Sequence, residues 1–254
     1  MALTWLYTLI SIVGVSLLSL VGALTLFFST AFLKRSIFVL VSIAVGALFG
    51  DVFIHILPEA FEVLPVGVVS ALILSGILIF FVLEKFLHWH HDHIEECDEC
   101  NEKNTHIEPV GYMTLVSDTL HNFIDGLIIG SSFLVSPSLG FATTLAVAFH
   151  EIPQEIGHFG LLIHAGFSRG RALWLNFVSA LSAILGGVVA LMITFQITHF
   201  VDYVLPITAG GFLYIAGSDL VPELHKTRDP QKSIIQIVAI VVGFGIMFSL
   251  LAFE

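Results

Sequence analysis

Eight apolar segments, each long enough to form a membrane-spanning helix, follow one another along this sequence. They are residues 4–28, 36–60, 65–87, 111–135, 140–165, 172–196, 201–223 and 233–252. A helix needs about 20 consecutive apolar residues to cross the hydrocarbon core of a bilayer. Only 11% of the residues are charged, against about 25% in soluble domains. We therefore expect an all-α integral membrane protein in which residues 1–254 form one domain of eight transmembrane helices.

The basic residues are confined to alternate connections between these segments. All nine lie at or beside the first, third, fifth and seventh connections; they are Lys34, Arg35, Lys85, Lys103, Arg169, Arg171, Lys226, Arg228 and Lys232. Loops on the cytoplasmic side of a membrane carry an excess of Lys and Arg. This pattern predicts that the odd connections are cytoplasmic and that both termini are extracytoplasmic.

The fourth apolar segment, residues 111–135, carries ionisable side chains near its middle. Asp118, His121 and Asp125 are separated by three and four residues, a spacing that places all three on one face of a helix. Asn122 lies beside that face. The spacing predicts a polar stripe within an otherwise apolar helix.

The fifth segment, residues 140–165, carries a second group of such side chains. His150 and Gln154 form one pair four residues apart, and Glu151 and Glu155 form another. Side chains with this spacing lie about 5–6 Å apart on a helix, so each pair is close enough to share one ion. A short connection makes the fourth and fifth segments antiparallel neighbours, and we expect their polar faces to meet.

Acidic residues lie in the apolar segments without a basic residue near them. They are Asp51, Asp118, Asp125, Glu151, Glu155 and Asp219. An aspartate at the centre of a bilayer costs about 2.5–3.5 kcal/mol, so a mobile cation, either protons or a metal ion, must compensate it. The interleaved histidines favour a metal, because imidazole with carboxylate and amide oxygens suits zinc, with iron(II) or manganese as alternatives. For any single residue, a polar contact between helices is the alternative.

Five motifs resemble, in order along the chain, those of the ZIP (Zrt/Irt-like) divalent metal transporters. They are "GDVFIHILPEA" (50–60), "HNFIDG" (121–126), "HEIPQEIGHFG" (150–160), "LNFVSAL" (175–181) and "GGFLYIAGSDLVPEL" (210–224). The subfamily with the signatures H-N-F-x-D-G and H-E-x-P-H-E-x-G-D is the most similar. The resemblance implies an inverted repeat of helices 1–3 and 6–8 around helices 4–5, and a homodimer as the candidate assembly.

The resemblance also implies which residues bind the metal. The first site would consist of His121, Asp125, His150 and Gln154. The neighbouring second site would consist of Asn122, Glu151 and Asn176, with Asp125 as a candidate bridge. Groups where the ion enters or leaves would be Asp51, His55 and Asp219.

Two departures from the subfamily signature concern metal selectivity. Gln154 stands in place of the second histidine, and His158 stands in place of the aspartate. Since an amide is a weaker, neutral ligand, Glu155, a water molecule or His158 would complete the first site, and Asp118 and His158 are expected along the pathway. We expect zinc as the substrate, with cadmium, iron(II), manganese and cobalt as further candidates.

The long polar connection at residues 88–110 contains a second concentration of metal-ligating residues. They are His88, His90, His91, His93, Cys97, Cys100 and His106. A single C-x-x-C pair cannot complete a zinc site, so histidines would have to contribute. We interpret this loop as a cytoplasmic acceptor or sensor of metal; a solvated acidic loop with incidental histidines is the alternative.

The sequence therefore predicts a secondary transporter, not an enzyme, that moves a divalent metal ion into the cytoplasm by alternating access. An intramembrane metalloprotease is one alternative, but a zincin helix needs histidines at i and i+4, and position 154 is Gln. A metal-selective channel or sensor is another. The expected partners are the metal ion and the lipid bilayer, with no nucleic acid, and the expected location is the plasma membrane, as the inner membrane of a bacterium.

Overall fold

Residues 2–24, 30–92, 109–193 and 199–253 are described by the computed structural model, and every element within these ranges is helical. The elements are α1 (Ala2–Leu18), α2 (Val21–Leu24), α3 (Thr30–Gly50), η1 (Asp51–Ile56), α4 (Leu57–Val63), α5 (Val66–Asp92), α6 (Pro109–Val135), α7 (Pro137–His164), α8 (Arg169–Ala180), α9 (Ser182–Ile193), α10 (Phe200–Tyr214), η2 (Ile215–Leu220), α11 (Val221–Leu224), α12 (Pro230–Leu250) and η3 (Leu251–Phe253). The prediction of an all-α chain is confirmed, and each predicted apolar segment contains at least one helix.

Among the described residues, five helices are long and apolar enough to cross a membrane. They are Ser36–Val63, Val66–Lys85, Arg169–Ile193, Phe200–Leu224 and Pro230–Leu250. Helix α1 is apolar but has 17 residues. Helices α6 and α7 have 27 and 28 residues, but their central histidines, carboxylates and amides lower their hydropathy. These features are typical of an integral membrane protein that keeps its polar side chains on internal helices.

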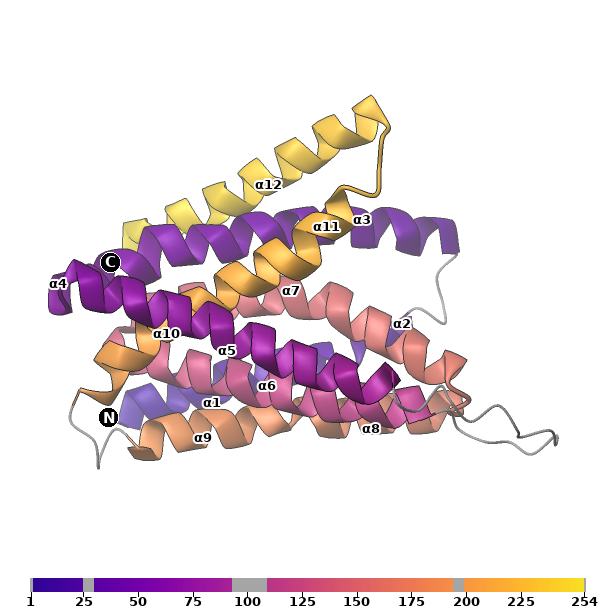
Figure 1. Ribbon diagram of the computed structural model, residues 1–254, viewed down its shortest axis with the longest axis horizontal. Helices are drawn as coiled ribbons and strands as arrows, with labels where there is room; N and C mark the ends of the chain where they lie inside the picture. Colours follow the sequence, from indigo (N-terminus) through magenta and orange to yellow (C-terminus); the bar gives the residue numbers. More distant parts are fainter. Residues whose placement is uncertain (1, 25–29, 93–108, 194–198, 254) are drawn as a thin grey trace.

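The helices form two groups that pack side by side. In the first group, α6 lies along α9 and α7, and α1 packs against α6, α7 and α9. In the second group, α3 lies along α12 and α5 lies along α10. Figure 1 shows α12 and α3 on one side of the molecule and α8 and α9 on the other. We call these groups the α6–α7 bundle and the α5–α10 bundle. They meet where α3 contacts α7 and α10 contacts α6.

Close backbone contacts occur within each bundle. A Cβ atom on Gly186 of α9 would lie 1.9 Å from the carbonyl oxygen of Phe123 on α6. In the other bundle, a Cβ atom on Gly76 of α5 would lie 2.1 Å from the carbonyl oxygen of Ile207 on α10. Small residues at such crossings allow helix backbones to approach closely in membrane proteins. The glycines therefore hold each bundle together as a unit.

Two π-helical segments interrupt the second bundle at related places. Segment η1 ends two residues before Pro58, and η2 ends two residues before Pro222. A proline ring clashes with the carbonyl group four residues earlier, which belongs to Ile54 in η1 and to Ser218 in η2. The wider turn of each π segment accommodates that carbonyl group. The motifs "LPEA" and "VPEL" thus share a local structure as well as a sequence pattern.

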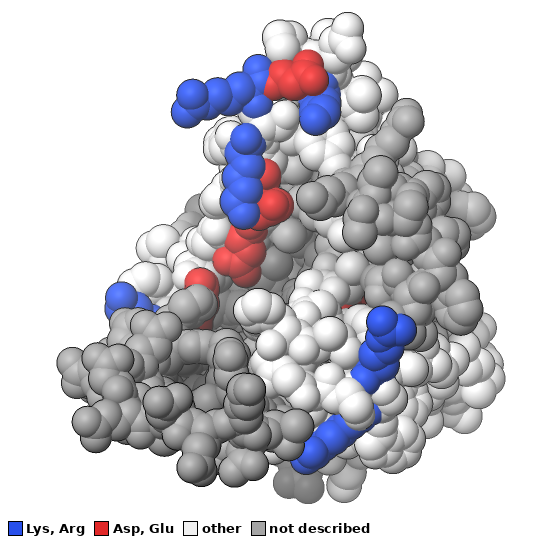
Figure 2. Space-filling model, turned by 90° about the vertical axis from the view of Figure 1, so that its right-hand side faces the viewer, with Lys and Arg blue, Asp and Glu red and all other residues white. Residues whose placement is uncertain are grey.

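The basic side chains that the structure describes lie at one end of the bundle. They are Lys85, Arg169, Arg171, Lys226, Arg228 and Lys232, and they come from the end of α5, the start of α8 and the connection between α11 and α12. These elements end at the right of Figure 1, and Figure 2 looks directly onto this end. The basic residues that alternate between connections in the sequence are therefore gathered at one end of the folded chain.

The tight crossing at Gly186 predicts a strong effect of one added methyl group. Gly186→Ala should lower the free energy of unfolding by about 1–3 kcal/mol, because the new Cβ atom overpacks a helix crossing. The measurement is thermal unfolding of the purified protein in detergent. Gly160→Ala on α7 is the matched control, since a Cβ atom there meets nothing within 4 Å. Equal melting temperatures for the two variants would contradict the prediction.

Candidate metal centre

Four metal-ligating side chains meet between α6 and α7. His121 and Asp125 come from successive turns of α6, and His150 and Glu151 come from α7. One ligand atom of each lies within 4.8 Å of all the others. The antiparallel packing of α6 on α7 thus brings together residues 29 positions apart.

The distances between these atoms suit one small metal ion. His121 Nε2 lies 3.3 Å from His150 Nε2, 3.6 Å from Asp125 Oδ2 and 3.4 Å from Glu151 Oε1. His150 Nε2 lies 3.2 Å from Asp125 Oδ2 and 3.7 Å from Glu151 Oε1. A tetrahedral zinc ion with bonds of about 2.0–2.1 Å keeps its ligand atoms about 3.3–3.4 Å apart. Five of the six distances between these atoms are therefore close to those of a tetrahedral N2O2 zinc site, and the sixth, between the two carboxylates, is at most 4.8 Å.

The histidine on α7 is oriented by its surroundings. His150 Nδ1 donates a hydrogen bond to the carbonyl oxygen of Ala146 at 3.3 Å, which directs the lone pair of Nε2 toward the centre. Such an outer contact fixes the tautomer and the ring orientation of metal-binding histidines. Phe212 of α10 packs edge-on against the His150 ring with centroids 6.2 Å apart. The other bundle thus closes one side of the centre with an apolar ring.

The centre has an excess of buried negative charge. The side chains of Asp125 and Glu151 are each 1% exposed. Within the part of the chain that the structure describes, both oxygens of Asp125 and Oε1 of Glu151 lack a hydrogen-bond donor. Their ion-pair contacts among the described residues are to His121 and His150 and not to Lys or Arg. Removing carboxylates from water without compensation costs several kcal/mol per charge. A divalent cation would compensate both carboxylates.

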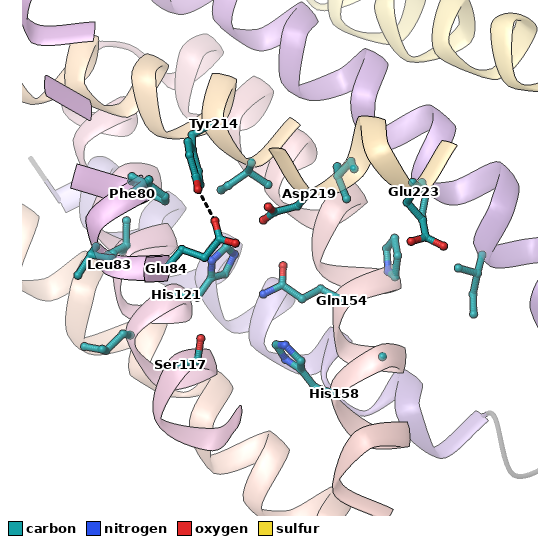
Figure 3. A pocket seen from close by; sticks show the side chains of 18 residues that line it. Phe80, Leu83, Glu84, Ser117, His121, Gln154, His158, Tyr214, Asp219 and Glu223 are labelled. Atoms are coloured by element: carbon teal, nitrogen blue, oxygen red, sulfur yellow. Dashed lines mark hydrogen bonds between the residues drawn. The ribbon is translucent and has the colours of Figure 1, made fainter. Parts of the chain in front are cut away.

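Gln154 does not face the centre in the same way as Glu151. It lines a cavity of about 530 Å³ between the two bundles, together with His121, Pro153 and His158. Figure 3 shows the side chains of Gln154 and His158 on α7 projecting into this cavity beside His121. The structure thus brings His121, Asp125 and His150 together with Glu151 and places Gln154 in the cavity that adjoins His121. The assignment of Gln154 to the first site stays a prediction.

Asp118, Asn122 and His158 form a polar group next to the centre. His158 Nδ1 lies 2.8 Å from Asp118 Oδ1, and Asn122 Nδ2 donates to the same oxygen at 3.1 Å. Asn122 and Asp118 are each 1% exposed, and Asp118 Oδ2 has no hydrogen-bond partner among the described residues. The predicted pathway residues Asp118 and His158 therefore lie in contact, bridging α6 and α7.

Glu155 and Asn176 form another buried pair, between α7 and α8. Asn176 Nδ2 donates to Glu155 Oε2 and to the carbonyl oxygen of Ser19. Glu155 is 1% exposed and Asn176 is fully buried. The residues that the resemblance assigned to a second site are thus distributed: Glu151 joins the centre, Asn122 contacts Asp118, and Asn176 contacts Glu155.

The predicted groups at the pathway mouths lie at opposite ends of the molecule. Asp51 is fully buried at the start of η1, and both its oxygens lack a hydrogen-bond partner among the described residues. His55 Nε2 donates to the carbonyl oxygen of Met247 at 3.0 Å and lines a cavity of about 420 Å³ with Glu59 and Glu62. Asp219 lines the cavity beside the centre, on the side of the basic residues.

The predicted metal-binding loop lies largely outside the described residues. His93, Cys97 and Cys100 are not described, and neither is His106. Helix α5 extends to Asp92, so the backbone of His88, His90 and His91 is described as helical, but their side chains are not described. Metal binding by this loop stays a prediction.

Two cavity residues have no counterpart in the sequence prediction. Glu84 of α5 accepts a hydrogen bond from the Tyr214 hydroxyl group of α10 at 2.5 Å. Both residues line the cavity that contains His121, and Figure 3 shows their contact. In the sequence, Glu84 precedes Lys85 at the end of an apolar segment, and this position is typical of an ordinary interfacial residue. The sequence shows only that Glu84 lies near the end of its apolar segment, and this position does not indicate that it lines a cavity.

Comparison with known proteins gives consistent matches over most of the chain. The model of one family, described as "ZIP Zinc transporter", matches residues 2–110 and 89–251. Zinc transporter ZIP13 of Pongo abelii is 36% identical over 223 residues, which cover 82% of this chain and 65% of the relative. Zinc transporter zipt-7.1 of Caenorhabditis briggsae is 30% identical over 313 residues, covering 96% of this chain and 78% of the relative. Zinc transporter YKE4 of Saccharomyces cerevisiae is 31% identical over 238 residues, covering 82% of this chain and 69% of the relative.

The geometry predicts that Glu151 contributes more to metal binding than Gln154 does. Glu151→Gln should weaken zinc binding at least about tenfold, a loss that even outer contacts of a metal site cause when removed, whereas Gln154→Ala should change it little. Zinc affinity is measured by competition with a chromogenic chelator. Binding elsewhere on the chain is subtracted with the Asp125→Ala/His150→Ala double variant. A larger loss in Gln154→Ala than in Glu151→Gln would contradict this assignment.

Proposed function

Since the chain belongs to the ZIP zinc transporter family, we propose that it is a secondary transporter that moves divalent metal ions, zinc foremost, across the membrane into the cytoplasm. The observation that carries this proposal is the buried N2O2 centre of His121, Asp125, His150 and Glu151. It lies between long helices and adjoins a cavity. Its two carboxylates would neutralise the ion, and its two imidazoles would replace part of the ion's water.

The protein is therefore a transporter and not an enzyme. The protease alternative required a second histidine at position 154, which is Gln and faces the cavity. A channel would differ from a carrier in its kinetics, because flux through a channel does not saturate at the same metal concentrations. Peptide cleavage that is lost in Glu151→Gln, without metal flux, would favour the protease.

The proposed topology has eight spans, with both termini extracytoplasmic and the basic end of the bundle in the cytoplasm. It is supported by the eight helical segments and by the gathering of Lys and Arg at one end. The cavity beside the centre opens among elements of that same end, so the described conformation would face the cytoplasm. The plasma membrane, as a bacterial inner membrane, stays a prediction.

We propose alternating access by movement of the α6–α7 bundle against the α5–α10 bundle. The close glycine crossings lie within the bundles, and this supports their movement as units. The matching π segments before Pro58 and Pro222 support an inverted repeat of the flanking helices. An interior-negative membrane potential would favour uptake of a dication by about 4.6 kcal/mol per 100 mV, twice the value for one charge. A homodimer is the proposed assembly.

The finer assignments rest on the family resemblance. A second ion would bind near Asn122, Glu151 and Asn176, with Asp125 as the bridge to the first site. At the first site, Glu155 or a water molecule would replace the ligand that Gln154 supplies weakly. The polar contacts of Asn122 and Asn176 with buried carboxylates support this placement. Cadmium, iron(II), manganese and cobalt are the proposed further substrates, because an N2O2 site accepts several borderline divalent metals.

Transport is tested in proteoliposomes that contain a metal-sensitive dye. Zinc should enter with saturable kinetics, and an interior-negative potential should accelerate it. Asp125→Ala and His150→Ala should each abolish flux, because each removes a ligand from the centre. Parallel runs with cadmium, iron(II), manganese and cobalt define the selectivity. The proposal is wrong if the purified protein moves none of these metals, or if both variants keep full flux.

The topology is tested by cysteine labelling in intact cells. In a background with Cys97 and Cys100 changed to Ser, Val66→Cys should react with a membrane-impermeant maleimide, because it lies at the start of α5, next to the second connection. Gly170→Cys, in the fifth connection, should react only after the membrane is permeabilised. Both positions are exposed. The reverse accessibility pattern would overturn the proposed orientation.

A further inference from the structure

The cavity beside the metal centre has one wall from each bundle. Ser117, His121, Gln154 and His158 come from α6 and α7, and Glu84, Tyr214, Asp219 and Glu223 come from α5 and the α10–η2–α11 segment. Figure 3 shows side chains of both sets projecting into one space. An ion that enters this space from the centre therefore meets groups of the other bundle.

Only one ligand of the centre reaches this cavity to a substantial extent. The side chain of His121 is 18% exposed, whereas those of Asp125, His150 and Glu151 are at most 1% exposed. His121 is also the only one of the four among the residues that line the cavity. An ion that leaves the centre in this conformation must pass His121.

The wall that faces His121 is acidic. Glu84, Asp219 and Glu223 line the cavity, and none of its described lining residues is Lys or Arg. Glu223 lies toward the basic end and pairs with Lys226. Glu84 comes from α5 and Asp219 from η2, so these two carboxylates reach the cavity from different elements of the α5–α10 bundle.

Tyr214 holds Glu84 in position. Its hydroxyl group donates to Glu84 Oε2 across 130 positions of sequence, joining α10 to α5. A carboxylate has about four lone-pair directions, so accepting one hydrogen bond is compatible with binding a cation. Carboxylates that bind metals are commonly oriented by such outer hydrogen bonds. Tyr214 is also the last residue before η2, the π segment that carries Asp219.

We propose that Glu84, oriented by the Tyr214 hydroxyl group, is the first group outside the centre to bind the metal ion as it is released past His121. This inference rests on the proposed transport function. Gln154, on the opposite wall, would supply its neutral amide oxygen to the same ion. Glu84 belongs to the α5–α10 bundle, so the ion would change bundles at this step.

The physical reason is the cost of releasing a dication from two buried carboxylates. Direct transfer to water would break all four contacts at once, in a medium where charge separation is expensive. A carboxylate fixed across the cavity lets the ion gain one ligand before it loses the others. Glu84 would therefore act on the rate of release and not on the stability of the filled centre.

The test separates flux from equilibrium binding. Glu84→Gln keeps the size of the side chain and removes its charge, and it should lower the maximal zinc flux in proteoliposomes at least about tenfold. Its zinc affinity in detergent should remain near that of the unaltered protein. Tyr214→Phe should lower the maximal flux in the same way with a smaller effect. The double variant should be no slower than Glu84→Gln, since the two side chains act as one unit.

Glu223→Gln is the matched control, because it removes a carboxylate of the same wall whose side chain is 52% exposed, and it should keep nearly full flux. The inference is overturned if Glu84→Gln transports at the unaltered rate, if Glu223→Gln is equally slow, or if Glu84→Gln loses zinc affinity in proportion to flux. If the unaltered protein moves no metal, the proposed function fails and the inference fails with it. Retained zinc affinity in Glu84→Gln shows that the variant is folded.

Discussion

The structure depends on how the negative charges of two buried carboxylates are compensated. Asp125 and Glu151 lie in the middle of an apolar bundle, almost fully buried, with histidines as their charged or chargeable neighbours. Charges of this kind are stable in a low-dielectric interior only with a partner. No lysine or arginine of the described chain contacts them, so the compensating positive charge belongs to a cation that can bind and dissociate. A site that needs a mobile dication is well suited to move one.

The rest of the fold keeps this site both buried and releasable. Helices α6 and α7 carry the ligands, and α9 holds α6 through a crossing that Gly186 makes possible. On the other side, Phe212 closes the centre with an apolar ring, while the cavity gives His121 an outlet. Some polar groups that do not face the centre are paired with one another, as in the contacts of Asp118 with His158 and of Asn176 with Glu155. Among the described residues, the centre thus meets the cavity at His121.

Much of this architecture could be predicted from periodicity and composition. Apolar runs predict helices because a bilayer leaves the backbone no other way to satisfy its hydrogen bonds. Spacings of three and four residues placed His121 with Asp125 correctly, since neighbours on a helix face are fixed by its geometry. The loop of residues 88–110 and the second metal site were predicted from composition or resemblance, and spacing alone gives no distances for either.

The sequence by itself determined the helices, the one-sided placement of basic residues and the facing polar stripes of α6 and α7. Only the tertiary structure placed Glu151 of α7 together with His121, Asp125 and His150. Glu151 and Gln154 are both close to His150 along the helix, and the rotation of α7 against α6 brings Glu151 inward and leaves Gln154 at the cavity. Glu84 likewise lines the cavity that contains His121 because α5 packs against α10 in one wall of it. Helical spacing is local, whereas the rotation and choice of partner helices follow from packing over the whole bundle.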